Sequence, residues 1–437
     1  MNNTDTLEQL RQCFIEVIPK ADARTIIPPL EFVINIIFCF LGDTECTSLE
    51  SIRRYMKNQT EKKSSRGSFW ERLASNRLKT LLRAAVSKLL TQLSTTVIGP
   101  RGLLKQLGII GIEIVDSCIF TLWDGASDDF PGVKTNAGIK LHSCFNPLTG
   151  KFSWFDMTPS STHDRKCFPD LQSLIGKLVI VDLGYWDFCL LWAIDNIGGF
   201  FLSRIKSKTV IYITEFVQAN FSKKHLGKSL FSLPLKRKRG DIIEIKVEKE
   251  CKSGILACRA IAFWNPAYNC YHWYITNLKV APHLIYPLYR LRWQIELVFK
   301  ACKQSLNANR LTSNNSNIIE SLLLASIAAH LASQTILNVA IPELTKIEQL
   351  AISVQRVAKV AVSIASDFIK FLVTGSSNNA KILLNKILLF ADEIFDPNYR
   401  HRETSLARTV YWRSFPKNPE HLWIPVPVLM FCLINLE

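Results

Sequence analysis

Three acidic residues occupy positions where a carboxylate is unusual. Asp116 lies inside an apolar stretch, Asp182 directly follows another, and Glu296 belongs to an amphipathic stretch further along the chain. A buried carboxylate is costly unless a cation or a metal ion pairs with it. Three carboxylates without an imidazole favour Mg2+, or Mn2+ in its place, over zinc. Two such ions held by these residues would suit an in-line phosphoryl displacement. Spacing alone does not single out these three residues, because the chain contains 37 acidic residues.

The stretch 289–303 divides its polar and apolar residues between two faces. At a helical advance of about 100° per residue, one face collects a tyrosine, a carboxylate and three cations: Tyr289, Arg292, Glu296, Lys300 and Lys303. We therefore predict one continuous amphipathic helix. The polar face suits a metal ligand set among phosphate contacts, and its ordinary alternative is a solvated helix surface.

The chain between residues 99 and 310 has the alternation of an α/β domain. Apolar runs rich in β-branched residues predict strands, and mixed runs between them predict helices. We expect strands at 109–122, 137–145, 151–158, 178–182 and 199–205, and helices at 164–175 and 186–196. A meander followed by crossover units predicts a mixed sheet with helices on both faces. If the first and fourth strands are adjacent and parallel, Asp116 and Asp182 come together.

Residues 206–277 interrupt this order. They are basic and contain four candidate strands, so we expect a β-rich insertion before the helix at 289. The run Lys236 to Arg239 suits a clamp on a phosphate backbone, or is an ordinary surface turn. The flanks, residues 1–98 and 311–437, have helical periodicity. The turn-forming run 99–102 is the expected boundary of the first flank.

The charge of the chain favours a polyanionic partner. Its formal net charge is +16, and a Lys or Arg set against a phosphate gains by counterion release. Between residues 53 and 88 stand eleven Lys or Arg against two Glu. That segment is a candidate DNA-binding region, and a solvated helical face explains it equally well.

The cysteine pattern, the N-terminal sequence and the apolar stretches indicate where in the cell the protein is expected. Twelve cysteines are scattered without a Cys-x-x-Cys pair, which is typical of reduced thiols in a cytosol. The N-terminus does not have the order of a signal peptide. The apolar stretch 322–341 contains His330 and Gln334, so we expect a core helix there and not a membrane span.

The residues around the carboxylates resemble those of a known family. Tyr289, Arg292, Glu296 and Lys303 have the spacing of the Tyr/Arg/Glu/Lys signature of DDE transposases from insertion sequence family four. The surrounding sequence is similar too, in the run 292–296, in the Thr-Asn pair at 276–277, in Asp182-x-Gly-Tyr and in Asp116-Ser. Leu183 and Cys118 depart from common family residues. The resemblance covers about residues 105–310.

The resemblance implies an RNase H-like catalytic core and cut-and-paste DNA transposition. Asp116, Asp182 and Glu296 would be both the catalytic and the metal-binding residues, and Tyr289, Arg292 and Lys303 would hold phosphates of the transposon end. The partners would be double-stranded DNA, as transposon ends and target, and a second copy of the chain, with no membrane. Some members stack an aromatic residue of the insertion on a flipped base, for which Trp264 and Trp273 are the candidates, although core packing explains either residue as well.

We therefore expect a Mg2+-dependent transposase that cleaves at terminal inverted repeats and transfers strands into target DNA, in the cytoplasm and associated with the nucleoid. A metal-dependent nuclease or resolvase on the same fold is one alternative, and a catalytically decayed DNA-binding copy is another. A basic membrane-surface protein is a more distant alternative, since no amphipathic terminal anchor is evident.

Overall fold

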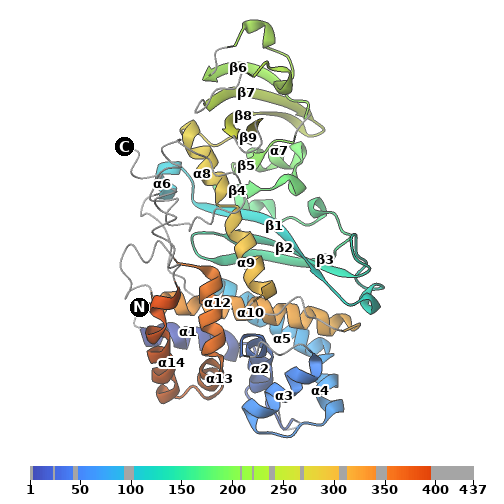
Figure 1. Cartoon of the computed structure of the whole chain (residues 1–437), viewed down its shortest axis with the longest axis vertical. Helices are drawn as coiled ribbons and strands as arrows, with labels where there is room; N and C mark the ends of the chain where they lie inside the picture. The colour runs from blue at the N-terminus through green and yellow to red at the C-terminus, as the bar shows by residue number, and fades with distance from the viewer. Residues whose placement is uncertain are drawn as a thin grey trace.

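The computed structural model describes residues 3–22, 25–42, 48–92, 103–206, 209–218, 221–235, 242–265, 270–304, 313–340 and 352–394. Three features of the sequence therefore lie outside the described residues: the turn run 99–102, the basic run 236–239 and the Pro-rich tail from residue 416. The described part consists of one mixed sheet above a body of helices (Figure 1).

One nine-stranded sheet, in the order β3-β2-β1-β4-β5-β9-β8-β7-β6, forms the centre of the molecule. Its strands are β1 (Gly111–Thr121), β2 (Gly138–Asn146), β3 (Lys151–Pro159), β4 (Lys177–Val181), β5 (Phe200–Arg204), β6 (Tyr212–Gln218), β7 (Ile242–Cys251), β8 (Gly254–Asn265) and β9 (Cys270–Thr276). β1, β4 and β5 are parallel neighbours, and every other pairing is antiparallel. The predicted adjacency of the first and fourth strands is confirmed.

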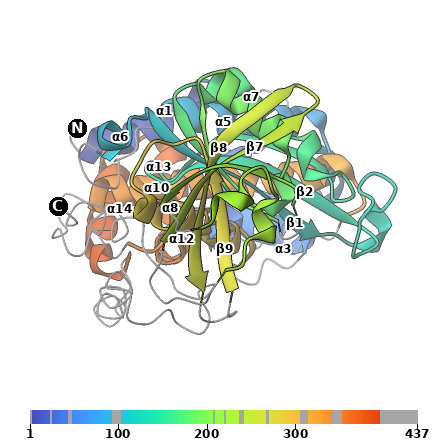
Figure 2. The ribbon, with the colours of Figure 1, turned by 90° about the horizontal axis from the view of Figure 1, so that it is seen from above.

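The β-rich insertion extends this sheet. Its last strand, β9, pairs antiparallel with β5, and β8, β7 and β6 follow outward in turn. A single sheet therefore runs from the hairpin β2–β3 to the insertion's edge strand. Figure 2 shows the strong twist along it. The strands of the insertion were predicted, but their continuity with the first five strands was not.

The two faces of the sheet bury different cores because successive strand residues point to opposite sides. On β4, Leu178 and Ile180 belong to the core shared with the helical body, while Val179 and Val181 belong to a second core beneath α7 (Phe188–Asn196). α8 (Ile285–Arg290) and α9 (Trp293–Gln304) pack on the first face. Both faces of the central strands are thus covered, as their uninterrupted apolar sequences require.

The helical body combines helices that precede the sheet in the chain with helices that follow it. Its N-terminal helices are α1 (Asn3–Ile15), α2 (Pro29–Gly42), α3 (Leu49–Thr60), α4 (Arg66–Leu73) and α5 (Asn76–Gln92), and α6 (Leu103–Leu107) leads into β1. Its C-terminal helices are α10 (Ser316–Ala340), α12 (Val354–Ser363), α13 (Ala365–Thr374) and α14 (Ser377–Leu389). α10 packs against α5, α2 and α1, and α13 packs against α2. The blue and orange helices therefore interleave in Figure 1.

α10 is the central helix of this body. Its length and composition would allow it to cross a membrane, yet 94% of its most apolar stretch is buried inside the protein. A helix that is apolar all round must be enclosed all round, and here the surrounding helices enclose it. This burial agrees with the predicted core helix.

The helix predicted at residues 164–175 was wrong. This segment forms two short 3-10 turns, Asp164–Lys166 and Leu171–Leu174. Pro169 lies between them, has no N–H to donate and disfavours helical geometry in the residue before it.

The expected continuous helix 289–303 is interrupted at Leu291 and Arg292, where α8 ends and α9 has not begun. Their amides bond to carbonyls three residues back, Leu288 and Tyr289, as in a 3-10 turn. This tighter turn changes the direction in which side chains before and after it point. Tyr289 and Glu296 consequently lie on different helices.

Candidate active site

Asp116 and Asp182 lie side by side at the same level of the sheet. Val115 is in register with Val181 across β1 and β4, so the next residue of each strand is one of the two aspartates. Parallel neighbours are about 4.8 Å apart. Both side chains belong to the face covered by α8 and α9, because they alternate with Val115 and Val181 of the other core.

Asp116 is a buried carboxylate in a strand, with 8% of the residue exposed. Its Oδ1 accepts a hydrogen bond of 2.8 Å from the Ser117 amide, and its Oδ2 lies 2.9 Å from Nη1 of Arg292. Burial raises the pKa of Asp116 to about 7. Arg292 opposes that rise, while the charges of Asp182 and Glu296 add to it. Burial therefore disfavours the charged form of Asp116 in spite of the arginine.

Asp182 is held by the turn that follows β4. It is the N-terminal capping residue of the 3-10 turn Leu183–Tyr185, and its Oδ1 accepts hydrogen bonds of 2.7 Å from the Gly184 amide and 3.4 Å from the Tyr185 amide. Such capping fixes the orientation of a carboxylate by backbone groups alone. The sequence Asp-x-Gly-Tyr thus positions its own aspartate.

Glu296 reaches the same site from α9, and Arg292 links it to β1. The Arg292 guanidinium donates from Nη1 to Asp116 and from Nη2 to Oε1 of Glu296, at 2.9 and 2.5 Å. Burial pulls the pKa of Arg292 down, but Tyr289 and the two carboxylates together outweigh burial and raise it. The arginine is firmly cationic, and it connects the first and third members of the predicted trio.

The donor set of this site fits a hard divalent ion, because every candidate ligand is a carboxylate. Within the described residues, however, no three His, Cys, Asp or Glu side chains are gathered closely enough to hold a metal ion as they stand. The Arg292 guanidinium lies between Asp116 and Glu296 and supplies positive charge to both carboxylates. A metal ion held by Asp116 and Glu296 together would compete with Arg292 for the same carboxylate oxygens.

The other two signature residues lie at the edges of the site. The Tyr289 ring packs 5.0 Å from that of Tyr274 on β9, and burial raises the pKa of its hydroxyl to about 12. Nζ of Lys303 lies 5.4 Å from the centre of the Phe120 ring on β1, and its side chain hydrogen-bonds Cys118. Lys300, which helical geometry placed on the same face, is exposed.

Arg204 also belongs to the site, and sequence reasoning missed it. Val181 is in register with Ser203 across β4 and β5, so Arg204 is level with Asp182 on the adjacent strand. Its charge acts on Tyr274 and Tyr289. A cation ending an apolar strand is a detectable signal, but only the strand order places it beside the aspartates.

The basic segment 53–88 forms α3, α4 and α5, and most of its cations contact carboxylates of the helical body. The pairs are Arg53 and Arg66 with Glu50, Lys62 with Glu31, Arg77 with Asp22, Lys79 and Arg83 with Glu320, and Lys88 with Glu16. Arg54, Lys57 and Lys63 are exposed. Much of the segment's charge therefore serves contacts within the protein.

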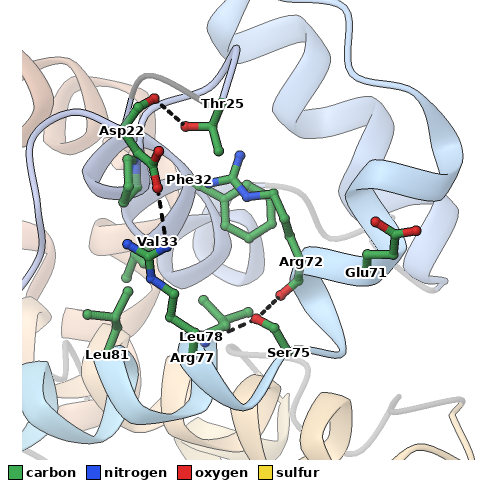
Figure 3. Close-up of a pocket in the computed structure, with 11 residues that line it drawn as sticks. Asp22, Thr25, Phe32, Val33, Glu71, Arg72, Ser75, Arg77, Leu78 and Leu81 are labelled. Carbon is green, nitrogen blue, oxygen red and sulfur yellow. Dashed lines mark hydrogen bonds and ion pairs between the residues drawn. The ribbon is translucent and has the colours of Figure 1, made fainter.

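A separate cavity of about 230 Å³ lies among α2, α4 and α5 (Figure 3). Arg72 covers one wall, with its guanidinium carbon 3.9 Å from the centre of the Phe32 ring and Nη1 bonded to the Ile27 carbonyl at 2.8 Å. Arg77 reaches Asp22 across its rim at 3.2 Å. These arginines are held within the helical body, away from the carboxylates of the sheet.

The two candidate stacking residues of the insertion lie inside the sheet. Trp273 on β9 is 3% exposed, and Trp264 on β8 is 9% exposed with its ring 5.1 Å from that of Tyr271. Both rings therefore pack within the protein in this structure. Their role in holding a flipped base stays a prediction.

Asp116 and Asp182 lie level on parallel strands of a mixed sheet, and Glu296 approaches them from a helix packed on the same face. The protein is therefore an α/β protein whose candidate active site is built from carboxylates. The family model for the Transposase DDE domain matches residues 112–332, about half of the chain and the whole of this region. The chain belongs to that family and is a DDE transposase.

Individual relatives agree with this assignment. The transposase for insertion sequence element IS1151 of Clostridium perfringens is 23% identical over 349 residues, which cover 65% of this chain and 74% of that protein. The transposases for IS231F and IS231E, from two subspecies of Bacillus thuringiensis (israelensis and finitimus), are 25% and 26% identical. Those matches cover 51% and 44% of this chain and 56% and 49% of the relatives. The chain thus spans about half the length of the IS231 proteins.

Among solved structures, the piggyBac transposase synaptic complex with hairpin DNA matches this chain. It has 9% sequence identity and a TM-score of 0.41, with 88% of this chain and 83% of the other covered.

Proposed function

We propose that the protein is a Mg2+-dependent transposase of insertion sequence family four, which cleaves DNA at terminal inverted repeats and joins the 3' ends to a target. The observation that carries this proposal is the position of Asp116 and Asp182, level on neighbouring parallel strands, with Glu296 linked to the first through Arg292. The strand order β3-β2-β1-β4-β5 supports an RNase H-like core.

In this proposal Asp116, Asp182 and Glu296 hold two Mg2+ ions, for which Mn2+ substitutes. When bound, the ions lower the pKa of an attacking water or 3'-hydroxyl and stabilise the leaving oxygen. The chain's own contribution is orientation: the Asp182 turn fixes one carboxylate by backbone hydrogen bonds, and β1 fixes the other. Glu296 would have to leave its ion pair with Arg292 in order to hold a metal ion.

The same proposal assigns the cations of the site to DNA phosphates. Arg292 turns from the carboxylates to a phosphate of the transposon end, where its planar fork makes two parallel hydrogen bonds. Tyr289, Lys303 and Arg204 contact neighbouring phosphates. Arg204 is added to the signature residues because it lies level with Asp182 on the same face.

We further propose that residues 1–98 are a DNA-binding region, that residues 99–310 are the catalytic domain and that residues 311–437 are a helical C-terminal region. The exposed cations of α3 and its following loop, Arg54, Lys57 and Lys63, are the candidates for DNA contact in the first region. Joining two ends in one complex implies a homodimer on DNA. The protein acts in the cytoplasm at the nucleoid, without a membrane.

The test is incubation of the purified protein with linear DNA that carries the element's own ends, with and without Mg2+. We expect strand-transfer products that need Mg2+ and disappear in Glu296→Gln, while end binding persists. Glu215→Gln, on the exposed edge strand β6, is the matched control and should keep activity. Cleavage without joining would favour a nuclease or resolvase, and binding without cleavage a decayed copy.

A further inference from the structure

A polar network lies behind the carboxylate pair, on the opposite face of the sheet. Ser117 follows Asp116 on β1 and therefore points to the other side. Its hydroxyl donates to Oδ1 of Asp164 at 2.9 Å. Nζ of Lys140 on β2 donates to the same oxygen at 2.9 Å and to the Thr162 carbonyl at 2.7 Å. Asp164 is thus tied to two strands by two donors.

The network continues to the turn that holds Asp182. The Tyr185 hydroxyl hydrogen-bonds Ser117 and lies 3.4 Å from Nδ1 of His142, whose Nε2 lies 2.9 Å from the Thr158 hydroxyl. Tyr185 and His142 are both fully buried. Hydrogen bonds in such an environment are strong, and a substitution that leaves one partner unpaired is costly. They join β1, β2 and β3 to the residue that ends the Asp182 turn.

Gly184 shows how closely Asp164 approaches this turn. A β-carbon built at Gly184 would lie 2.9 Å from Oδ1 of Asp182 and 3.0 Å from Oδ2 of Asp164. The two carboxylate oxygens are therefore no more than about 6 Å apart. The glycine leaves room for both, and a side chain there would displace one of them.

The ion pair between Lys140 and Asp164 is a costly arrangement for stability alone. Their side chains are 9% and 24% exposed, and burying a charge pair gains little over an apolar packing of similar volume. The position of this ion pair next to the two aspartates offers a better explanation for its presence. Asp164 accepts a hydrogen bond from Ser117, the residue that follows Asp116. It also lies on the other side of Gly184 from the Asp182 carboxylate.

We propose that Asp164, held by Ser117 and Lys140, is a positioning residue that keeps the Asp182 turn in place relative to Asp116 for binding a divalent cation. The inference rests on the proposed metal site, and it adds a residue outside the Tyr/Arg/Glu/Lys signature. Asp164 acts through the two aspartates and does not itself hold the metal. Groups that orient metal ligands typically change metal affinity 10- to 100-fold when they are removed.

The test measures metal binding without DNA and without turnover. The melting temperature of the full chain is followed as Mn2+ is added, and the Mn2+ concentration at half of the maximal shift is compared between variants. We expect Asp164→Ala to need on the order of 10-fold more Mn2+ than the wild type. Asp164→Asn, which still accepts from Ser117 and Lys140, should need less than Asp164→Ala. Asp129→Ala, on an exposed loop, is the matched control and should not change the midpoint.

Each outcome decides between alternatives. A lower melting temperature of Asp164→Ala without metal, combined with an unchanged Mn2+ midpoint, would show a purely structural role and overturn the inference. If Asp164→Ala does not fold, the double variant Lys140→Met with Asp164→Asn removes both charges together, and an unchanged midpoint there has the same meaning. A wild-type protein whose melting temperature does not respond to Mn2+ would overturn the proposed metal site, and this inference with it.

Discussion

Arg292 provides the sharpest test of how charge is balanced in this site. Its guanidinium lies between Asp116 and Glu296 at 2.9 and 2.5 Å, where it supplies positive charge to two carboxylates at once. If a divalent metal takes over that role, removal of the arginine should harm the metal-free protein and be compensated by metal. The change to make is Arg292→Ala.

The magnitude follows from the burial of the partners. Breaking a fully buried ion pair costs about 3–5 kcal/mol, because a charge remains without compensation. The side chains here are 19% exposed for Arg292, 12% for Asp116 and 32% for Glu296, so solvent screens part of that cost. We expect a loss of about 2–3 kcal/mol in the free energy of unfolding when metal is chelated.

Metal should restore most of this loss. A ligand at 100 times its dissociation constant stabilises the folded state by about 2.7 kcal/mol. Mg2+ binding to the variant has no guanidinium to displace, so its affinity should exceed that of the wild type. The measurement is urea denaturation of both proteins, in EDTA and in saturating Mg2+.

A matched control is available in the same sheet. Arg259 on β8 pairs with Glu244 at 2.6 Å, with side chains 16% and 9% exposed, and β8 is three strands away from β4 in the sheet. Arg259→Ala should be destabilised to the same degree in EDTA and in Mg2+. If Arg292→Ala proves as stable as the wild type in EDTA, or if Mg2+ leaves its deficit unchanged, the charge-replacement argument is wrong.

Three further predictions concern binding and stability. Arg204→Ala should weaken binding to transposon ends and lower the salt dependence of log K by about one phosphate contact. Lys246→Ala, an exposed residue of β7, should leave that slope unchanged, and an unchanged slope in both variants would remove Arg204 from the phosphate contacts. Tyr289→Phe keeps the ring against Tyr274 and should retain the melting temperature while weakening end binding, so equal end binding by the two proteins would refute a role for the hydroxyl. Burial lowers the pKa values of His272 and His330 to about 4 from 6.5, so the unfolded chain takes up protons first as the pH falls. Stability that these residues contribute above pH 6.5 should therefore be lost between pH 6.5 and 4, by about 3 kcal/mol for each histidine, and a flat pH profile in urea denaturation would contradict this.

The sequence by itself located the central strands and the carboxylates on them. Apolar runs around Asp116 and before Asp182 predicted β1 and β4, and both strands are present because burial on two faces requires uninterrupted apolar residues. The capping of Asp182 by its own turn is equally local, since the donors are the Gly184 and Tyr185 amides. An apolar run that forms a buried strand, and a carboxylate that caps the turn directly after it, are both local features of a sequence.

Local periodicity failed to predict a helix boundary where the backbone hydrogen bonding changes from the α to the 3-10 pattern. The polar face of 289–303 predicted one helix, yet a 3-10 turn at Leu291 and Arg292 separates Tyr289 from Glu296. The residue spacing alone does not distinguish bonds to the third residue from bonds to the fourth. The helix expected at 164–175 was excluded by Pro169, whose effect could have been recognised from the sequence.

Tertiary structure alone decided what surrounds the carboxylates. Arg204 is level with Asp182 because β5 pairs with β4, and Asp164 lies behind Asp116 because the connection from β3 folds under β1. Arg292 reaches Asp116, which stands 176 residues from it in the chain. Contacts of this kind depend on strand order and register, which arise from pairing between distant segments and leave no periodic signal in the sequence.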